Sequence, residues 1–188
     1  VGGGTVTAED VTRACLDRID ALDGSLHAWE AHDRDKALAL ARAVDDRRRR
    51  GEAPGPLCGV PVGVKDIFNT IDYPTQMGSP VYAGFTPGNN ARVVDYLYWH
   101  DAVMAGKTVT SEFAVHNPGA TVNPHNPAHP PGTSSSGSAV HVAAGMLPLS
   151  LGPQTLGSLL RPASPCGVRP FHPAFGLHPP PAEAQAPD

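Results

Sequence analysis

Apolar positions recur at helical spacing through the first fifty residues. After Thr7-Ala8-Glu9-Asp10, which has the composition of a capping box, apolar residues return every three or four positions as far as Leu22. Asp23-Gly24 is typical of a helix end. A second pattern of this kind spans about residues 33–50 and ends in four arginines, which complement the dipole at a helix C-terminus. We therefore expect two helices, and we interpret the arginines as a solvated helix end rather than a nucleic-acid or targeting signal.

Beyond Gly51 the pattern changes to short apolar runs separated by loops. Strands are predicted over 60–64, 102–106 and 147–151, and helices over 91–98 and 139–146. Lys65 and Lys107 each follow directly on a predicted buried strand, and Pro148 confines the last strand to a sheet edge or an irregular course. This alternation of strands and helices is typical of a layered α/β domain.

The composition excludes several classes of protein. The 188 residues suffice for one domain with its own core, and 40% of them are hydrophobic. With 17% charged residues and a net charge of −4, nothing indicates a nucleic-acid partner. No apolar run reaches the length of a membrane span, so we expect no membrane partner. The 20 glycines and 21 prolines lie mostly after residue 51 and predict many loops there.

Cysteine and histidine positions give no sign of a metal site or cofactor. The three cysteines, at 15, 58 and 166, are isolated, which argues against disulfides and zinc and favours a reducing, cytoplasmic location. His116, His125 and His129 fall in a loop rich in Asn-Pro pairs and are expected to shape that loop. The opening at Val1 rather than methionine suggests an incomplete N-terminus.

Serine and lysine residues supply the candidate chemistry. The run Gly132–Ala139 contains four serines, a further serine follows Gly157, and Lys65 closes an apolar run. A hydroxyl nucleophile, a hydroxyl relay and a lysine with a lowered pKa are sufficient for acyl transfer without histidine. The valines before Lys65 would supply the desolvation that lowers its pKa.

A Gly/Ser run is also typical of a flexible linker, and Lys65 could simply mark where a strand emerges into water. The segment after the serines, residues 139–146, is small and apolar, which favours a buried helix over a tether. Serine at the start of such a helix can cap free N–H groups. Capping and catalysis are compatible, because the same helix end favours a developing anion.

Four motifs occur together in order. They are GVPVGVKD at 59–66, GKTVTSEFA at 106–114, PGTSSSGSA at 131–139 and GSLLRPAS at 157–164, and Cys166-Gly167-Val168 and Pro173–Gly176 continue them. In this order and spacing the chain resembles the amidase signature family, over nearly its whole length. The resemblance implies an α/β fold, layered α/β/α with a mixed central sheet, of which only the N-terminal part is present. It implies a partial domain over 1–177, with helices over about 7–50 and a catalytic core over about 56–177, and a Pro-rich, disordered tail over 178–188.

The resemblance also implies a Ser–Ser–Lys mechanism. The family's lysine base falls on Lys65, its cis-configured serine on Ser134 and its nucleophile on Ser158. The nucleophile would attack a small-molecule amide and form an acyl-enzyme. Arg161 is expected to brace the loop rather than to act in catalysis. Backbone N–H groups would hold the oxyanion, from Thr155, Leu156, Gly157 and Ser158.

Several positions depart from the family pattern. Leu156 stands where glycine or alanine is usual, Pro153 where threonine is usual, and Thr133 replaces the second glycine before the serines. Trp99-His100-Asp101 occupies the place of a leucine-, alanine- and glycine-rich turn. A bulky side chain and a proline near the oxyanion donors predict a distorted loop.

Three functions remain open at this point. The chain is an amidase, a truncated or degenerate non-catalytic relative, or a counterpart of the amide-transferring subunit of a transamidation complex. Members of the family are much longer, and their substrate pocket is completed by later segments. A sheet without those strands would have an open edge, so we also expect self-association.

Overall fold

The computed structural model describes residues 1, 3–115, 117–174 and 177. His116 and the predicted tail at 178–188 lie outside the described residues. The helices are α1 (Ala8–Leu26), α2 (Arg34–Arg49), α3 (Arg92–Trp99), α4 (Ser136–Ala143) and α5 (Leu160–Cys166). The strands are β1 (Trp29–His32), β2 (Pro61–Lys65), β3 (Val103–Thr108) and β4 (Leu149–Leu151), and short 3₁₀ turns lie at Pro80–Tyr82 and Glu112–Ala114.

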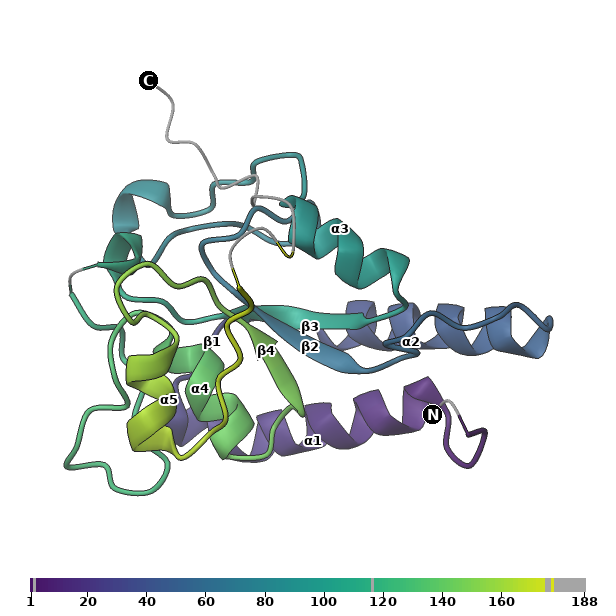
Figure 1. Ribbon diagram of the computed structural model, residues 1–188, viewed down its shortest axis with the longest axis horizontal. Coiled ribbons are helices and arrows are strands. Elements are labelled where there is room, and N and C mark those ends of the chain that lie inside the picture. Colours follow the sequence, from purple (N-terminus) through teal and green to yellow (C-terminus); the bar gives the residue numbers. More distant parts are fainter. Residues whose placement is uncertain (2, 116, 175–176, 178–188) are drawn as a thin grey trace.

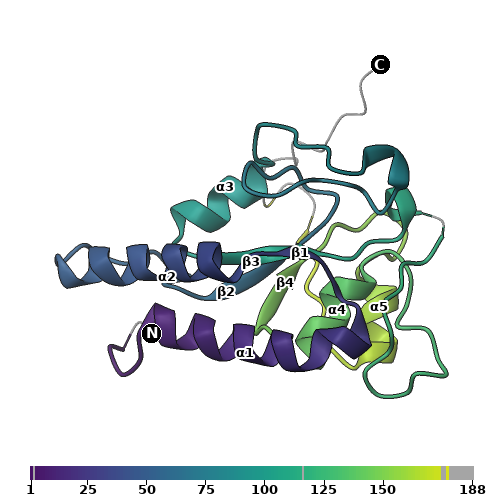
Figure 2. The same cartoon turned by 180° about the vertical axis from the view of Figure 1, so that it is seen from behind.

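The four strands form one mixed sheet in the order β1-β3-β2-β4. β2 runs parallel to both β3 and β4, whereas β1 is antiparallel to β3. Helix α3 covers one face, and α1, α4 and α5 lie on the other (Figures 1 and 2). The predicted layered α/β/α arrangement with a mixed sheet is therefore confirmed. Because β2 and β3 are parallel, Lys65 and Thr108 are paired at the same end of the sheet.

The helix starts follow the sequence closely. The Thr7 hydroxyl accepts the Asp10 N–H at 3.0 Å, and the Asp10 carboxylate accepts the Thr7 N–H at 3.2 Å, which confirms the capping box. Asp33 caps α2 by accepting the Lys36 N–H at 2.9 Å. The predicted end of α1 at Gly24 is wrong. The helix continues to Leu26 and is closed by His27 in the left-handed conformation.

Two elements were not predicted. β1 has only four residues between two helices, and it is a strand because it pairs with β3. α5 follows Ser158 and includes Pro162 and Pro165, so its local sequence argues against a helix. The strand predicted over 102–106 ended too early, because β3 continues through Lys107 and Thr108. Helix α4 begins three residues earlier than predicted.

Alternation along β3 divides the core between the two faces of the sheet. Val103 and Ala105 pack with α1 and α2, whereas Met104 packs with Val64 and with α3. β2 is buried at every position, as expected for a central strand covered on both faces. Lys65 is the last residue of that buried strand, so its amine lies in the interior.

The turn at Asp101 shows how one departure from the family pattern is accommodated. Asp101 has φ +66°, a conformation that favours glycine but that Asp and Asn tolerate better than other residues. Its carboxylate accepts the Gly55 N–H at 2.6 Å and forms an ion pair with Arg47. The aspartate therefore offsets its backbone strain with two polar contacts.

A histidine whose ring has no hydrogen-bond partner among the described residues lies in the interior of the fold. His141, on α4, is fully buried and stacks on Trp29 of β1, with ring centroids 4.9 Å apart. A Cβ on Gly63 would lie 2.6 Å from the imidazole, so the strand passes directly over the ring. Neither ring nitrogen has a hydrogen-bond partner within the described part of the chain. Burial lowers the pKa of His141 to about 3, and only the Gly137 carbonyl acts against the shift.

We predict that His141 makes the fold sensitive to acid. Because its folded-state pKa lies below the unfolded value of about 6.5, the unfolded chain takes the proton first. Above about pH 6.5 the ring is uncharged in both states, so its titration does not lower stability. Below that pH the free energy of unfolding falls by about 1.4 kcal/mol per pH unit. In urea unfolding between pH 4.5 and 7, His141→Leu should lose stability less steeply than the wild type. The exposed-site control His129→Leu should behave as the wild type, and parallel curves for wild type and His141→Leu would contradict the prediction.

Candidate active site

A buried lysine and a buried serine form a hydrogen bond at the end of β2. The Lys65 side chain is 0% exposed, and its amine donates to the Ser134 hydroxyl at 2.6 Å. Burial lowers the pKa of Lys65 from its ordinary value to about 7. Near neutral pH a large share of the amine is therefore uncharged, and an uncharged amine can accept a proton.

The serine run is fixed to the same end of the sheet by contacts with the segment that follows β3. The Ser111 N–H donates to the Ser134 carbonyl at 3.2 Å. The hydroxyls of Thr108 and Ser138 are 2.7 Å apart, which ties α4 to β3. These contacts hold Ser134 opposite Lys65.

The other serines of the run show that it is not a linker. Ser135 and Ser136 are buried, and their hydroxyls have no hydrogen-bond partner among the residues that the structure describes. Ser135 is the N-cap of α4 but makes no side-chain capping bond.

The cis configuration implied for Ser134 is not present, because every peptide bond between described residues is trans. Trans is the lower-energy form at a non-proline residue, by about 3 kcal/mol.

Ser158 lies in a turn before α5 and is partly exposed. No hydrogen bond joins it to Ser134 or to any other described residue. Two close contacts nevertheless bring its segment to the serine run. A Cβ on Gly132 would lie 2.4 Å from Pro162, and one on Gly152 would lie 3.0 Å from the Ser135 hydroxyl. The structure thus joins Lys65 to Ser134 and places the Ser158 segment beside them.

The proposed oxyanion donors are free to bind. Within the described residues, the N–H groups of positions 155–158 make no hydrogen bond. The Leu156 side chain is 81% exposed, so it points into solvent and does not crowd the turn. The Gln154 side chain instead accepts the Leu160 N–H at 3.0 Å and fixes the start of α5.

A second buried lysine was missed as a functional candidate. Lys107 of β3 is 0% exposed and forms an ion pair of 2.8 Å with Asp66, whose side chain is also 0% exposed. Burial lowers the pKa of Lys107, and Asp66 acts against this shift. The signal was in the GKT motif, but the sequence pattern indicates only that Lys107 follows a predicted buried strand.

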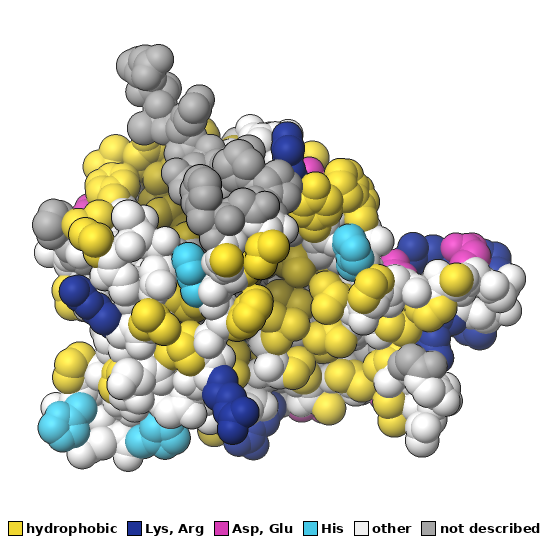
Figure 3. All heavy atoms as spheres, in the orientation of Figure 1, with side chains coloured by type: hydrophobic (Ala, Val, Ile, Leu, Met, Phe, Trp, Pro, Cys, Tyr) yellow, Lys and Arg dark blue, Asp and Glu magenta, His cyan; other side chains and the backbone are white. Residues whose placement is uncertain are grey.

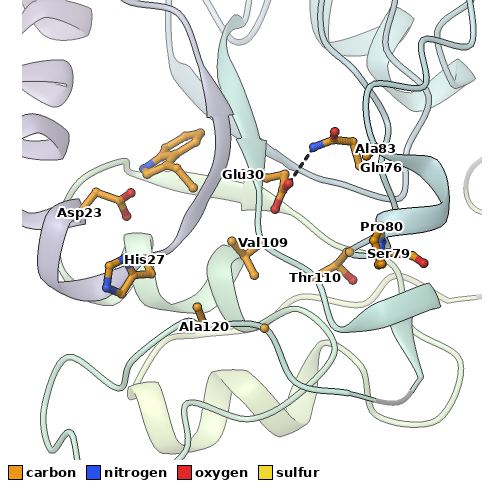
Figure 4. Close-up of a pocket in the computed structure, with 13 residues that line it drawn as sticks. Asp23, His27, Glu30, Gln76, Ser79, Pro80, Ala83, Val109, Thr110 and Ala120 are labelled. Carbon is orange, nitrogen blue, oxygen red and sulfur yellow. Dashed lines mark hydrogen bonds between the residues drawn. The ribbon is translucent and has the colours of Figure 1, made fainter.

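A cavity of about 450 Å³ lies between the end of α1, β1 and the loop around residues 76–83. Figure 4 shows Glu30 and Gln76 joined across it, with Asp23 and His27 at the other end. The Gln76 amide donates to Glu30 at 2.7 Å, and burial raises the pKa of Glu30, with the Asp66 charge as a smaller cause. Lys65, Ser134 and Ser158 do not line this cavity.

The part of the chain that the structure describes contains no cluster of three or more His, Cys, Asp or Glu side chains that could hold a metal ion. Within that same part, no helix is both long and apolar enough to cross a membrane.

The amidase family model matches residues 10–182. Among curated relatives, a glutamyl-tRNA(Gln) amidotransferase subunit from Chloroflexus aurantiacus is 42% identical over 94% of this chain. The corresponding subunit from Acidothermus cellulolyticus is 44% identical over 91% of this chain. These matches span only 37% and 35% of the relatives' own lengths.

Solved structures of similar fold include the peptide amidase PAM bound to the competitive inhibitor chymostatin. It shares 38% identity and a TM-score of 0.81 over 86% of this chain and 36% of its own. A protein from a vestigial complex related to an s-triazine catabolic enzyme has 37% identity and a TM-score of 0.82, over 88% of this chain and 38% of its own. The chain belongs to the amidase signature family and spans a little over a third of the length of these relatives.

We predict that Ser134 and Ser135 contribute differently to the free energy of unfolding. Ser134→Ala removes the one hydrogen-bond partner that the Lys65 amine has within the described residues, and it should cost about 1–3 kcal/mol of unfolding free energy. Ser135→Ala is the matched control, because it removes a buried hydroxyl that is already without a partner, and it should be neutral or stabilising. Denaturant unfolding of both variants at pH 8 tests this, and equal losses would contradict it.

Proposed function

We propose that this chain carries the catalytic residues of an amidase that cleaves the C–N bond of a carboxylic amide through an acyl-enzyme on Ser158. The observation that supports this most strongly is the 2.6 Å hydrogen bond between a buried lysine of lowered pKa and Ser134. A desolvated amine beside a hydroxyl is the arrangement that general-base catalysis by lysine requires.

In the proposed mechanism a proton moves in two steps toward Lys65. Ser134 gives its hydroxyl proton to the neutral amine while it takes the proton of Ser158. The Ser158 oxygen then attacks the amide carbonyl, and the N–H groups of positions 155–158 stabilise the oxyanion. As the C–N bond breaks, the proton returns through Ser134 to the leaving nitrogen. Water then attacks the acyl ester by the same proton route and releases the acid.

The mechanism requires Ser158 to come within hydrogen-bond distance of Ser134. The turn that carries Ser158 is exposed at Thr155 and Leu156. Because its N–H groups make no hydrogen bond to described residues, a movement of the turn would break none of them. We propose that a bound substrate draws this turn toward Ser134, because catalytic hydrogen bonds that are long in the free enzyme tighten when the substrate binds.

A second candidate function is amide transfer. The relatives named as glutamyl-tRNA(Gln) amidotransferase subunits are 42–44% identical to this chain over nearly all of it. Transfer would use the same acyl-enzyme on Ser158 and would pass the released ammonia to an acceptor instead of to solvent. A non-catalytic chain is the third candidate, and absence of any labelling at Ser158 would favour it.

We also propose that the substrate is a small-molecule amide and that the protein is cytoplasmic. Residues 1–177 would form one partial domain. We also propose self-association. β4 is at the edge of the four-stranded sheet, and apolar side chains gather near the centre of the face in Figure 3. Exposed large apolar residues of the chain include Val81, Leu156 and Phe171.

We predict that a serine-directed phosphonate will modify Ser158 and not Ser134. Only Ser158 adjoins the free N–H donors, whereas the Ser134 hydroxyl is buried against Lys65. Peptide mapping by mass spectrometry would locate the adduct, with Ser158→Ala as the control. An adduct on residues 134–136 would overturn the assignment of the nucleophile.

Modification of Ser158 should also depend on pH and on Lys65. The reaction should slow as pH falls through about 7, because protonated Lys65 cannot accept a proton. Lys65→Ala should slow it by about two to four powers of ten. Lys65→Arg should not restore the rate, since arginine stays charged. A fast reaction of the Arg variant would remove lysine as the base.

The 188-residue chain should elute from gel filtration as a species larger than a monomer and bind a hydrophobic dye. Open strand edges and exposed apolar surface favour association. Val81→Lys combined with Phe171→Lys should reduce dye binding. A compact monomer that binds no hydrophobic dye would contradict this proposal.

A further inference from the structure

Lys107 makes an unusually complete set of contacts for a buried lysine. Besides the ion pair with Asp66, its amine donates to the Phe68 carbonyl at 3.0 Å, the Pro74 carbonyl at 3.0 Å and the Thr75 hydroxyl at 2.9 Å. All of these groups belong to one segment, residues 66–75. Lys107 therefore gathers both ends of that segment onto the end of β3.

The gathered segment begins immediately after Lys65. The Lys65 carbonyl accepts the N–H groups of Ile67 at 2.7 Å and Phe68 at 3.1 Å, so the segment turns back over the end of β2. The Asp66 N–H donates to Thr108 at 2.9 Å. A shift of residues 66–68 would therefore displace the backbone from which the Lys65 side chain projects.

Asp66 extends the same network to the far end of the segment. Its carboxylate accepts the Gln76 N–H at 3.0 Å, and its carbonyl accepts the Met77 N–H at 3.1 Å. Gly78 then packs against the backbone of Thr110 and Ser111, and Ser111 donates to Ser134. One network thus connects Lys107 to the backbone of both members of the Lys65–Ser134 pair.

Stability alone does not explain this arrangement. Burying an ion pair often contributes no more than well-packed apolar residues of similar volume would. The charged groups that face Lys107 are Asp66 and, at longer range, Glu30. A buried polar network in which one amine bonds several groups of the same segment does, however, favour one backbone geometry.

We propose that Lys107 is a positioning residue for the base. Its ion pair with Asp66 and its bonds to residues 68–75 hold the turn that follows Lys65, and through that turn they keep the buried amine in place beside Ser134. This role rests on the proposed function of Lys65 as the base. Lys107 itself touches neither Ser134 nor Ser158.

The sequence offers a direct readout, because the chain has only three lysines, at 36, 65 and 107. Protein labelled with carbon-13 at lysine Cε gives three NMR signals, and each substitution of a lysine deletes its own signal. Lys36→Met is a matched control, since the Lys36 amine donates to the Asp72 carbonyl of the same segment at 2.6 Å, but from the exposed side. The titration midpoint of Lys65 can thus be followed in every variant.

In the wild type and in Lys36→Met, the Lys65 signal should titrate near pH 7. In Lys107→Met its midpoint should rise by about one pH unit or more, because water that reaches the amine removes part of the desolvation. Thr75→Val removes one partner of Lys107 without removing its charge, and it should raise the midpoint by a smaller amount. This second variant decides the question if Lys107→Met does not fold.

The outcomes separate the two claims. A wild-type Lys65 that titrates near the ordinary value of about 10.4 would remove the proposed base itself. A wild-type midpoint near 7 that stays unchanged in folded Lys107→Met, or in Thr75→Val when the former is unfolded, would overturn only the positioning role. A midpoint that rises equally in Lys36→Met would also overturn it, because any loosening of the segment would then suffice.

Discussion

The burial of one amine at the end of a central strand is the constraint on which the rest of the site depends. Lys65 is fully buried, and its amine has a single hydrogen-bond partner, the Ser134 hydroxyl, among the described residues. Burial favours the uncharged form of this amine, because no carboxylate of the described residues forms an ion pair with it. The sheet covered on both faces and the turn after β2 therefore lower the pKa of this amine as a consequence of packing, which is the property that the proposed base requires.

The two lysines at this end of the sheet solve the problem of burial in opposite ways. Lys107 keeps a carboxylate partner and three oxygen acceptors, and these anchor it. Lys65 has only a hydroxyl, and a partner of that kind can give its proton away. The two identical side chains occupy adjacent register positions on β2 and β3. Their different surroundings are consistent with the structural role that we propose for Lys107 and the chemical role that we propose for Lys65.

Much of the fold and the first half of the site could be predicted from the sequence. The capping box at Thr7, the buried run before Lys65 and the serines before an apolar helix are local signals, and the structure has each of them. β1 could not be predicted, since a four-residue strand exists only through its pairing with β3. The Asp66–Lys107 pair likewise depends on the parallel register of two strands that are forty residues apart.

The position of Ser158 depends on longer-range contacts. Its turn was expected to be strained by Leu156, but that side chain extends into solvent, which no local pattern indicates. Gly132 and Gly152 allow the turn and the serine run to approach each other, and their role becomes visible only when the neighbouring atoms are known. His141 is a similar case, because the burial of its ring, which makes the fold sensitive to acid, depends on the Trp29 and Gly63 that enclose it.

The most direct test of the central claim is the pH dependence of stability with and without the buried amine. Urea unfolding of the wild type and of Lys65→Met should be compared between pH 7 and 9.5. The unfolded chain binds a proton at Lys65 throughout this range, whereas the folded chain does not, so the wild type should gain stability relative to the variant as pH rises. The expected gain is about 1.4 kcal/mol per pH unit. A difference between the two proteins that stays constant over this range would show that Lys65 is charged in the folded state and would contradict the account.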